Sequence, residues 1–173
     1  MTANVKFAKV KEGAIIPSKR DEDMGFDIYA CFDEDYIKIL PHETKLIPTG
    51  IASACDPEYG FILFERGSTG SKGIARRCGI IDSGYRNEWF IGLTNTTNNL
   101  LIIAKEDADY KDEVWLWNKL YPSSRVTIYS YTKAIAQALV MPVPKVKVEE
   151  FSYHELKEIK SERGMGALGS SNK

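Results

Sequence analysis

The sequence has few of the residues from which disulfide frameworks and metal centres are built. Its three cysteines, Cys31, Cys55 and Cys78, lie far apart without a Cys-x-x-Cys pair, and it has two histidines in 173 residues. A disulfide framework or a zinc site is therefore not expected, because both need paired or closely spaced ligands. Such sparing use of cysteine is typical of a reducing compartment, and we expect a cytoplasmic protein.

Long apolar runs and an excess of charge of one sign are missing as well. No stretch supplies the roughly 20 apolar residues of a membrane-spanning helix, and the first residues lack the apolar core of a signal peptide. Lysine and arginine number 23 against 24 aspartate and glutamate, which gives a net charge of -1. We therefore expect neither a membrane nor nucleic acid as a direct partner, and an anionic ligand must be bound by local groups.

Short segments of β type dominate what is present. They are rich in β-branched and aromatic residues, and proline or glycine separates many of them. Regularly spaced short strands with this punctuation predict an all-β sandwich or barrel, and the length favours one domain. The expected strands cover residues 5–11, 27–32, 36–40, 45–51, 61–64, 89–93, 100–104, 125–129 and 134–141.

Four segments depart from the β pattern. Residues 68–73 allow a helix that is short at best, and "SYHELKEIK" (152–160) predicts a helix with a Ser-x-x-Glu capping box. "KEDADYKDEVWLWNKLYPSS" (105–124) has its own cluster of aromatics and is read as an insertion. It is expected to form a packed hairpin or lid over the core; the alternative is a contact surface for a neighbouring subunit or protein partner. The glycine-rich stretch 161–173 predicts a flexible arm following a domain of residues 1–160.

Several polar, glycine-bearing patches between the strands could carry chemistry. "GIIDSGYRNE" (79–88) places Asp-Ser-Gly between apolar runs and is read as a tight hairpin. "ERGSTGSKG" (65–73) offers hydroxyls, cations and bare backbone amides to an anion, although its spacing is not that of a P-loop. Gln137 stands inside an apolar strand and needs hydrogen-bond partners there. Arg163, followed by glycines and serines, offers the groups that surround a phosphate.

Taken in order, these stretches resemble the five motifs of the trimeric dUTPases. "MGFDIYA" (24–30) is similar to motif one, "ERGSTGSKG" (65–73) to motif two and "GIIDSGYRNE" (79–88) to motif three. "KAIAQALVMP" (133–142) is similar to motif four and "ERGMGALGSS" (162–171) to motif five. The resemblance implies an all-β subunit of the dUTPase barrel or jelly-roll type. It also implies a homotrimer in which three chains build each site.

The resemblance assigns a reaction to these residues. It implies that Asp82 activates the water that attacks the α-phosphorus of dUTP, which releases dUMP and pyrophosphate. Such an enzyme limits uracil in DNA and supplies dUMP for thymidylate synthesis. Tyr85 would pack on the deoxyribose and exclude a 2′-hydroxyl. Gly79, Ile80 and Ile81 would recognise uracil through backbone groups.

The resemblance also implies how the phosphates and the lid are held. One Mg²⁺ is expected on the three phosphates, with Asp27 contacting it through water. Leu168 would cover the base, although the family carries an aromatic residue there, and Gly67 replaces a serine hydroxyl of motif two. The residues implied in phosphate binding are Arg66, Gly67, Ser68, Gln137, Arg163, Gly169 and Ser170.

Two other functions remain open at this point. The fold-related dCTP deaminases would release ammonia and would need a general base near the pyrimidine amine, for which no separate motif is found. A nucleotide-sensing binding protein would use residues 105–124 to contact another protein. Asp82, Tyr85, Gln137 and Arg163 are all present, which favours catalysis.

Overall fold

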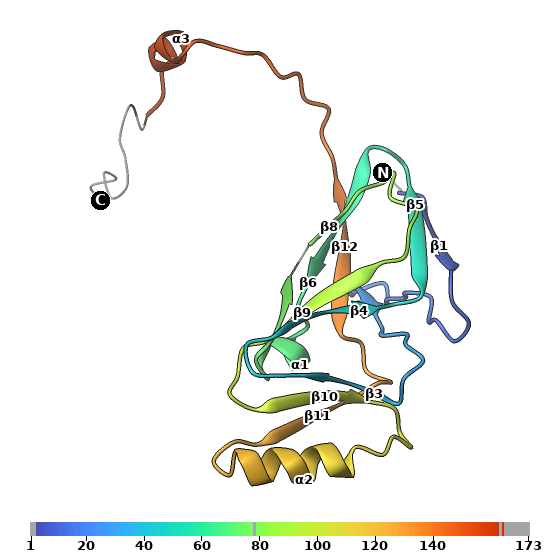
Figure 1. The fold of residues 1–173 in the computed structure, drawn as a ribbon. Helices are drawn as coiled ribbons and strands as arrows, with labels where there is room; N and C mark the ends of the chain where they lie inside the picture. The colour runs from blue at the N-terminus through green and yellow to red at the C-terminus, as the bar shows by residue number, and fades with distance from the viewer. Residues whose placement is uncertain (1–2, 78, 163, 165–173) are drawn as a thin grey trace. The chain divides into compact units, whose positions relative to one another are not determined.

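The computed structural model describes residues 3–77, 79–162 and 164, and the chain divides into two compact units, Met1–Val143 and Pro144–Lys173 (Figure 1). The first unit holds nearly all of the regular structure. In chain order its elements are β1 Val5–Lys9, β2 Phe26–Ile28, β3 Tyr36–Ile39, β4 Thr44–Pro48, β5 Ile51–Cys55, β6 Tyr59–Phe64, α1 Gly67–Gly70, β7 Ile74–Arg77, β8 Ile80–Ile81, β9 Phe90–Asn95, β10 Leu100–Ala104, α2 Lys111–Leu120, β11 Val126–Ser130 and β12 Ala136–Pro142.

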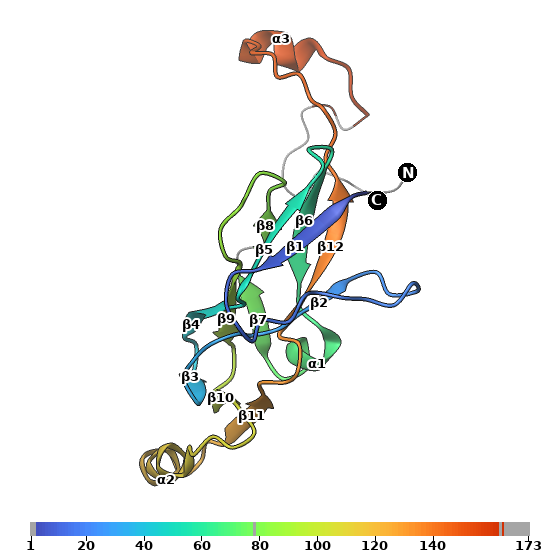
Figure 2. The same cartoon turned by 90° about the vertical axis from the view of Figure 1, so that its right-hand side faces the viewer.

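The strands of this unit form four small sheets (Figures 1 and 2). Their strand orders are β1-β5, β11-β10-β3, β2-β12-β6-β8 and β4-β9-β7. Neighbouring strands are antiparallel except β10 and β11, which run parallel. The all-β prediction is confirmed, but the sheets do not close into the expected barrel. Strands of only two to seven residues end their ladders before closure, and the chain then moves to another sheet.

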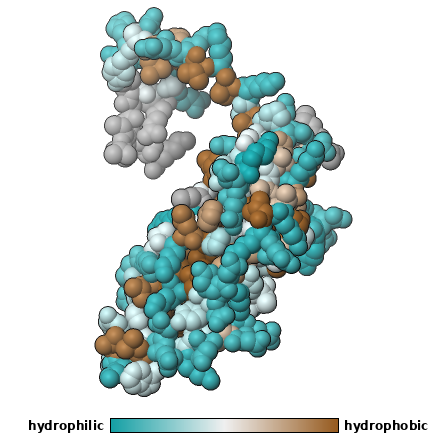
Figure 3. All heavy atoms as spheres, turned by 45° about the vertical axis from the view of Figure 1, so that its right-hand side comes forward, coloured by the Kyte–Doolittle hydropathy of each residue, from teal (hydrophilic) through white to brown (hydrophobic). Residues whose placement is uncertain are grey.

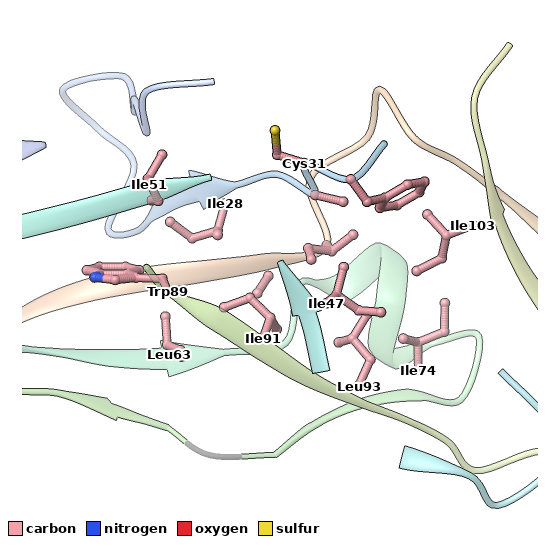
Figure 4. Packing of buried hydrophobic residues seen from close by; sticks show 14 of the residues in the cluster. Ile28, Cys31, Ile47, Ile51, Leu63, Ile74, Trp89, Ile91, Leu93 and Ile103 are labelled. Atoms are coloured by element: carbon pink, nitrogen blue, oxygen red, sulfur yellow. The ribbon is translucent and has the colours of Figure 1, made fainter. Parts of the chain in front are cut away.

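The larger of two apolar clusters in the unit receives residues from all four sheets (Figure 4). Trp89 is fully buried in this cluster and meets the ring of Phe61 edge-on at 4.9 Å and that of Phe7 at 5.7 Å. Such contacts add to the free energy of burying the rings. The side chains of Ile28, Ile47, Ile91 and Leu93 converge beside them. This core holds the strands in place, and the candidate site residues lie on these strands or in the segments that connect them.

Strand β10 is buried on both faces because helix α2 covers its sheet. Leu101 and Ile103 face the central core, while Leu100, Ile102 and Ala104 form a second apolar cluster. The second cluster is completed by Val114 and Trp117 of α2, together with residues of the neighbouring strands. Residues 105–124 were expected to form a packed hairpin or a lid over the core; the segment is no hairpin, but it does form a cover. It covers the outer face of the sheet as a helix.

The surface of the first unit is polar with scattered apolar side chains, as Figure 3 illustrates for one face. The outer side of α2 exposes Trp115, Leu116 and Leu120. Among the described residues, no helix has the length and apolar character needed to cross a membrane.

The second unit contains helix α3, Tyr153–Glu158, which confirms the helix predicted over residues 152–160. Its capping box is formed in both directions. Ser152 Oγ accepts a hydrogen bond from the Glu155 N–H at 3.2 Å, and the Glu155 carboxylate accepts one from the Ser152 N–H at 2.9 Å. Hydrogen bonding of the Glu155 carboxylate with the Ser152 side chain and with the Ser152 N–H lowers the pKa of Glu155. The capping box also satisfies backbone donors that a helix start leaves free.

Because β10 is buried on both faces, we expect a residue on its outer face to contribute as much to the free energy of unfolding as a residue in the core. Ile102→Ala should lower the free energy of unfolding by about 2–4 kcal/mol, because it opens a cavity beneath α2. Ile128→Ala, on the adjacent strand β11, is the matched control, since Ile128 is exposed. Urea denaturation at one fixed protein concentration measures both variants. Equal losses for the two would mean that α2 does not cover this sheet.

Candidate functional site

The stretch 79–88 does not form the hairpin that its sequence predicts. Strand β8 pairs with β6, whereas β9 pairs with β4 and β7, so the two flanking strands belong to different sheets. The turn itself is present, because the Tyr85 N–H donates to the Asp82 carbonyl at 3.0 Å. The separation has a physical cause: Trp89 is drawn into the core at the start of β9, which carries the chain away from β8.

Strand β8 lies at the edge of its sheet and offers unpaired backbone groups there. The Leu63 N–H donates to the Gly79 carbonyl at 2.7 Å, and the ladder continues with Ile62 opposite Ile80 and Phe61 opposite Ile81. Hydrogen-bonded and non-bonded pairs alternate in an antiparallel ladder, so Ile80 is in a non-bonded pair. Its N–H and C=O therefore point away from β6 and are open to a ligand.

The turn that carries Asp82 and Tyr85 is fastened to strand β5 by Arg86. Its guanidinium donates to the carbonyls of Ser83 and Ser53, the latter at 3.3 Å. The Tyr85 hydroxyl donates to the carbonyl of Glu88 at 3.1 Å. These bonds fix the backbone that follows Asp82, and the pairing of Ile81 with Phe61 fixes the backbone before it, so the carboxylate projects from a supported turn.

A separate row of polar residues crosses the sheet β2-β12-β6. The register places Gln137 of β12 opposite Asp27 of β2 on one side and opposite Phe64 of β6 on the other. The Gln137 amide donates to the Glu65 carbonyl at 2.8 Å. Asp27 forms a two-point ion pair with Arg66, with Oδ1 at 2.8 Å from Nε and Oδ2 at 3.2 Å from Nη2. Each partner of this pair leaves about a third of its side chain exposed to a ligand.

Gly25 allows the Gln137 amide to lie in this row. A Cβ atom at residue 25 would stand 3.1 Å from Gln137 Oε1 and 3.3 Å from Gln137 Cβ. The packing therefore explains why the "MGFD" stretch has a glycine: a larger residue would crowd the Gln137 side chain on the neighbouring strand.

Five of the predicted site residues line one open cleft of about 790 Å³: Asp27, Arg66, Gly67, Ser68 and Gln137. The opposite wall consists of the loop before β2, including Lys19, Arg20, Glu22 and Asp23. Sequence reasoning did not identify this wall, and its one visible signal is the run of charges "KRDED". The predicted residues Gly79, Ile80, Ile81, Asp82 and Tyr85 do not line the cleft, and Arg163, Leu168, Gly169 and Ser170 lie outside the described residues.

The cleft carries as many carboxylates as cations, and most of them are paired. Arg20 binds Asp23 through Nε–Oδ2 and Nη2–Oδ1 contacts of 2.8 Å each, and this hydrogen bonding lowers the pKa of Asp23 to about 2. Asp27 and Arg66 form the second pair. Within the described part of the chain, no three acidic, histidine or cysteine side chains cluster as metal ligands. A hard cation would therefore bind through phosphate oxygens and water, with carboxylates such as Asp27 in outer contact.

Comparison with known proteins identifies the family to which these features belong. The dUTPase family profile matches residues 11–108 of the chain. A deoxyuridine 5'-triphosphate nucleotidohydrolase of Nautilia profundicola is 31% identical over 179 residues, which cover 98% of this chain and 99% of the relative. The chain belongs to the dUTPase family.

Solved structures of dUTPases share the fold. A variant of the phage 80alpha dUTPase aligns with a TM-score of 0.69 at 22% identity and covers 99% of this chain and 100% of its own. A variant of the dUTPase of S. aureus phage phi11, which coordinates a structural Mg(II) ion, has a TM-score of 0.64 at 19% identity. That alignment covers 88% of this chain and 99% of the other. At this identity the likeness confirms the dUTPase fold.

Arg86→Ala tests how the turn that carries Asp82 and Tyr85 is fastened. Removing two carbonyl contacts of a charged donor should raise hydrogen exchange at the Tyr85 amide by about tenfold or more. Exchange measured by NMR or mass spectrometry reports this directly. Arg77→Ala is the control, because Arg77 donates to Thr94 Oγ1 in a different sheet. Unchanged protection of the Tyr85 amide in Arg86→Ala would mean that the turn is stable without the hydrogen bonds from Arg86.

Proposed function

We propose that the protein hydrolyses dUTP to dUMP and pyrophosphate by attack of water on the α-phosphorus. The observation that carries this proposal is the Asp27–Gln137–Arg66 row in an open cleft of about 790 Å³. A guanidinium, an amide, bare backbone at Gly67 and the Ser68 hydroxyl together suit the oxygens of a phosphate chain. Membership of the dUTPase family supplies the nucleotide and the reaction.

Uracil is recognised in this proposal by the free edge of β8. Uracil presents N3–H as a donor beside the acceptor O4, whereas cytosine presents an acceptor and an amine at the same positions. The C=O and N–H of Ile80 match the uracil pattern and would be left unpaired against cytosine, which costs binding energy. Gly79 and Ile81 hold Ile80 in register, and Tyr85 packs on the deoxyribose.

A homotrimer is part of the proposal. The phosphate cleft and the Asp82 turn are separate features of one chain, since Asp82 and Tyr85 are not among the residues that line the cleft. In a shared site, the cleft of one chain meets the base-recognising edge of another, so assembly is required for turnover.

Asp82 is the group that handles the water. A carboxylate accepts a hydrogen bond from water and orients its lone pair toward the phosphorus, and it takes up the proton as the bond to phosphorus forms. Arg66 and Gln137 lie where they can stabilise charge that develops on the phosphate oxygens.

Mg²⁺ fits the donors of the cleft as an ion carried mainly by the phosphates. Both oxygens of Asp27 face Arg66, so the carboxylate is suited to contact through water. The ion would supply charge neutralisation along the phosphate chain.

The arm of residues 161–173 completes the proposed site after a catalytic domain of residues 1–160. Arg163 would bind the terminal phosphate, Gly169 and Ser170 would add donors, and Leu168 would cover the base. Leucine offers less face contact than an aromatic ring, so more of the closing energy rests on Arg163. The physiological role would be to limit uracil in DNA and to supply dUMP for dTMP synthesis. The low use of cysteine supports a cytoplasmic location.

Pyrophosphate release from dUTP, dCTP, dTTP and UTP, assayed side by side with magnesium, tests the function. We expect dUTP to exceed each of the others by at least about 100-fold in kcat/KM, because each competitor adds a clash or leaves a polar group unpaired. Release of ammonia from dCTP would favour the deaminase alternative. Nucleotide binding without any product would favour the sensing protein.

Asp82→Asn separates binding from chemistry. The amide keeps the shape of the side chain but cannot take the proton of the water, so turnover should fall by about 10²–10⁴-fold. The dissociation constant of the non-hydrolysable analogue dUpNHpp should change less than about threefold, measured by calorimetry. Asp107→Asn, an exposed site elsewhere, should retain normal turnover. Near-normal turnover of Asp82→Asn would remove Asp82 from the role of base.

A further inference from the structure

The loop from Ser18 to Met24 is fastened to the phosphate cleft at its base. The Asp27 N–H donates to the Ser18 carbonyl at 3.1 Å, which brings the start of the loop against the strand that carries Asp27. Most of the loop then lines the cleft opposite Arg66 and Gln137. The loop is therefore a wall of the cleft with a fixed starting point.

The tip of the loop is closed by the Arg20–Asp23 pair. Besides the two side-chain contacts, the Asp23 N–H donates to the Arg20 carbonyl at 3.1 Å and the Arg20 N–H donates to Asp23 Oδ2 at 3.2 Å. Four contacts between two residues three positions apart make a tight turn. The carbonyls of Arg20 and Asp23 are consequently held close together.

Those two carbonyls receive the Lys19 ammonium. Nζ donates to the Asp23 carbonyl at 2.8 Å and to the Arg20 carbonyl at 3.2 Å, and it lies 5.8 Å from the centre of the Phe26 ring. Two neutral acceptors and a ring face hold the ammonium in place and leave its charge intact.

Lys19 differs from the other cations of the cleft in this respect. Arg20 is neutralised by Asp23, and Arg66 by Asp27. Among the described residues, Lys19 is in no ion pair. Of the cations described as lining the cleft, Lys19 is therefore the one whose charge is not already balanced by a carboxylate in an ion pair.

From this arrangement we propose that Lys19 binds the phosphate chain of the nucleotide. The contact is a further substrate-binding interaction outside the five motifs, and it rests on the proposed function only for the identity of the nucleotide. The ligand class is a polyphosphate with its divalent cation. Glu22 lies on the same wall. Its carboxylate would attract the cation of such a complex, whereas it would repel a polyphosphate without a cation.

Charge removal at constant length tests the proposal. In Lys19→Gln, the dissociation constant of dUpNHpp with magnesium should rise about five- to tenfold, and that of dUMP less than about twofold, because dUMP lacks the distal phosphates. The KM for dUTP should rise similarly while kcat stays within about twofold. Inorganic triphosphate with magnesium is the second probe and should lose affinity by a similar factor.

Two variants control for charge and packing. Lys105→Gln removes a lysine that likewise donates to a backbone carbonyl, that of Asp33 at 2.7 Å, and lies over an aromatic ring, but it does not line the cleft. It should bind both probes as the unchanged protein does. Lys19→Arg keeps the charge and should bind within about twofold of the unchanged protein, which a structural role tied to the ammonium would not allow. Thermal unfolding of every variant verifies that the fold is kept.

The results also separate this proposal from the proposed function. Hydrolysis of dUTP by the unchanged protein together with wild-type affinity of Lys19→Gln overturns the lysine contact alone. An equal loss in Lys105→Gln overturns it too, because the effect would then be general electrostatics. Absence of dUTP hydrolysis, with inorganic triphosphate still bound through Lys19, overturns the proposed reaction and keeps the contact.

Discussion

The register of strand β12 is the constraint on which the cleft lined by Asp27, Arg66 and Gln137 depends. This strand pairs with β2 and β6 at once, so the positions of Asp27, Gln137 and Phe64 along the sheet follow from one ladder. A shift of one residue would turn Gln137 to the opposite face and place Ala136 or Ala138, which are now buried, beside Asp27. Burial of these alanines therefore fixes the register, and the register fixes the cleft.

The free edge of β8 and the Asp82 turn depend on a different constraint, the burial of Trp89. Because its ring is held in the core, the chain leaves the turn toward β9 and cannot pair back on β8. Strand β8 thereby remains an edge with the backbone groups of Ile80 free. A two-stranded hairpin, as the sequence alone indicates, would have consumed those groups in its own ladder.

Much of the fold and part of the site could be predicted from local patterns. The apolar runs at 36–40, 61–64 and 100–104 and the capping box at Ser152 are local signals, and the structure has the expected elements there. Helix α2 was missed because Val114, Trp115 and Trp117 are as typical of strands as of helices. It forms because the outer face of β10 needs cover, which is a long-range requirement. The expected strand 45–51 is interrupted at Gly50, whose φ of +65° turns the chain into β5.

The loop wall of the cleft could not be predicted for the same reason. Its charges read locally as a solvated run, and only the Asp27–Ser18 hydrogen bond and the Arg20–Asp23 pair bring them to the phosphate side. Paired charges at a binding site hold their side chains in place without creating a strong field in the empty cleft. In the proposed function, a phosphate chain that arrives with its divalent cation would exchange partners with these pairs. The cation would be attracted to the carboxylates and the phosphates to the guanidinium groups, with little net charge to desolvate. In the proposed site the ammonium of Lys19, which is in no ion pair among the described residues, would supply positive charge to the phosphates from the loop wall.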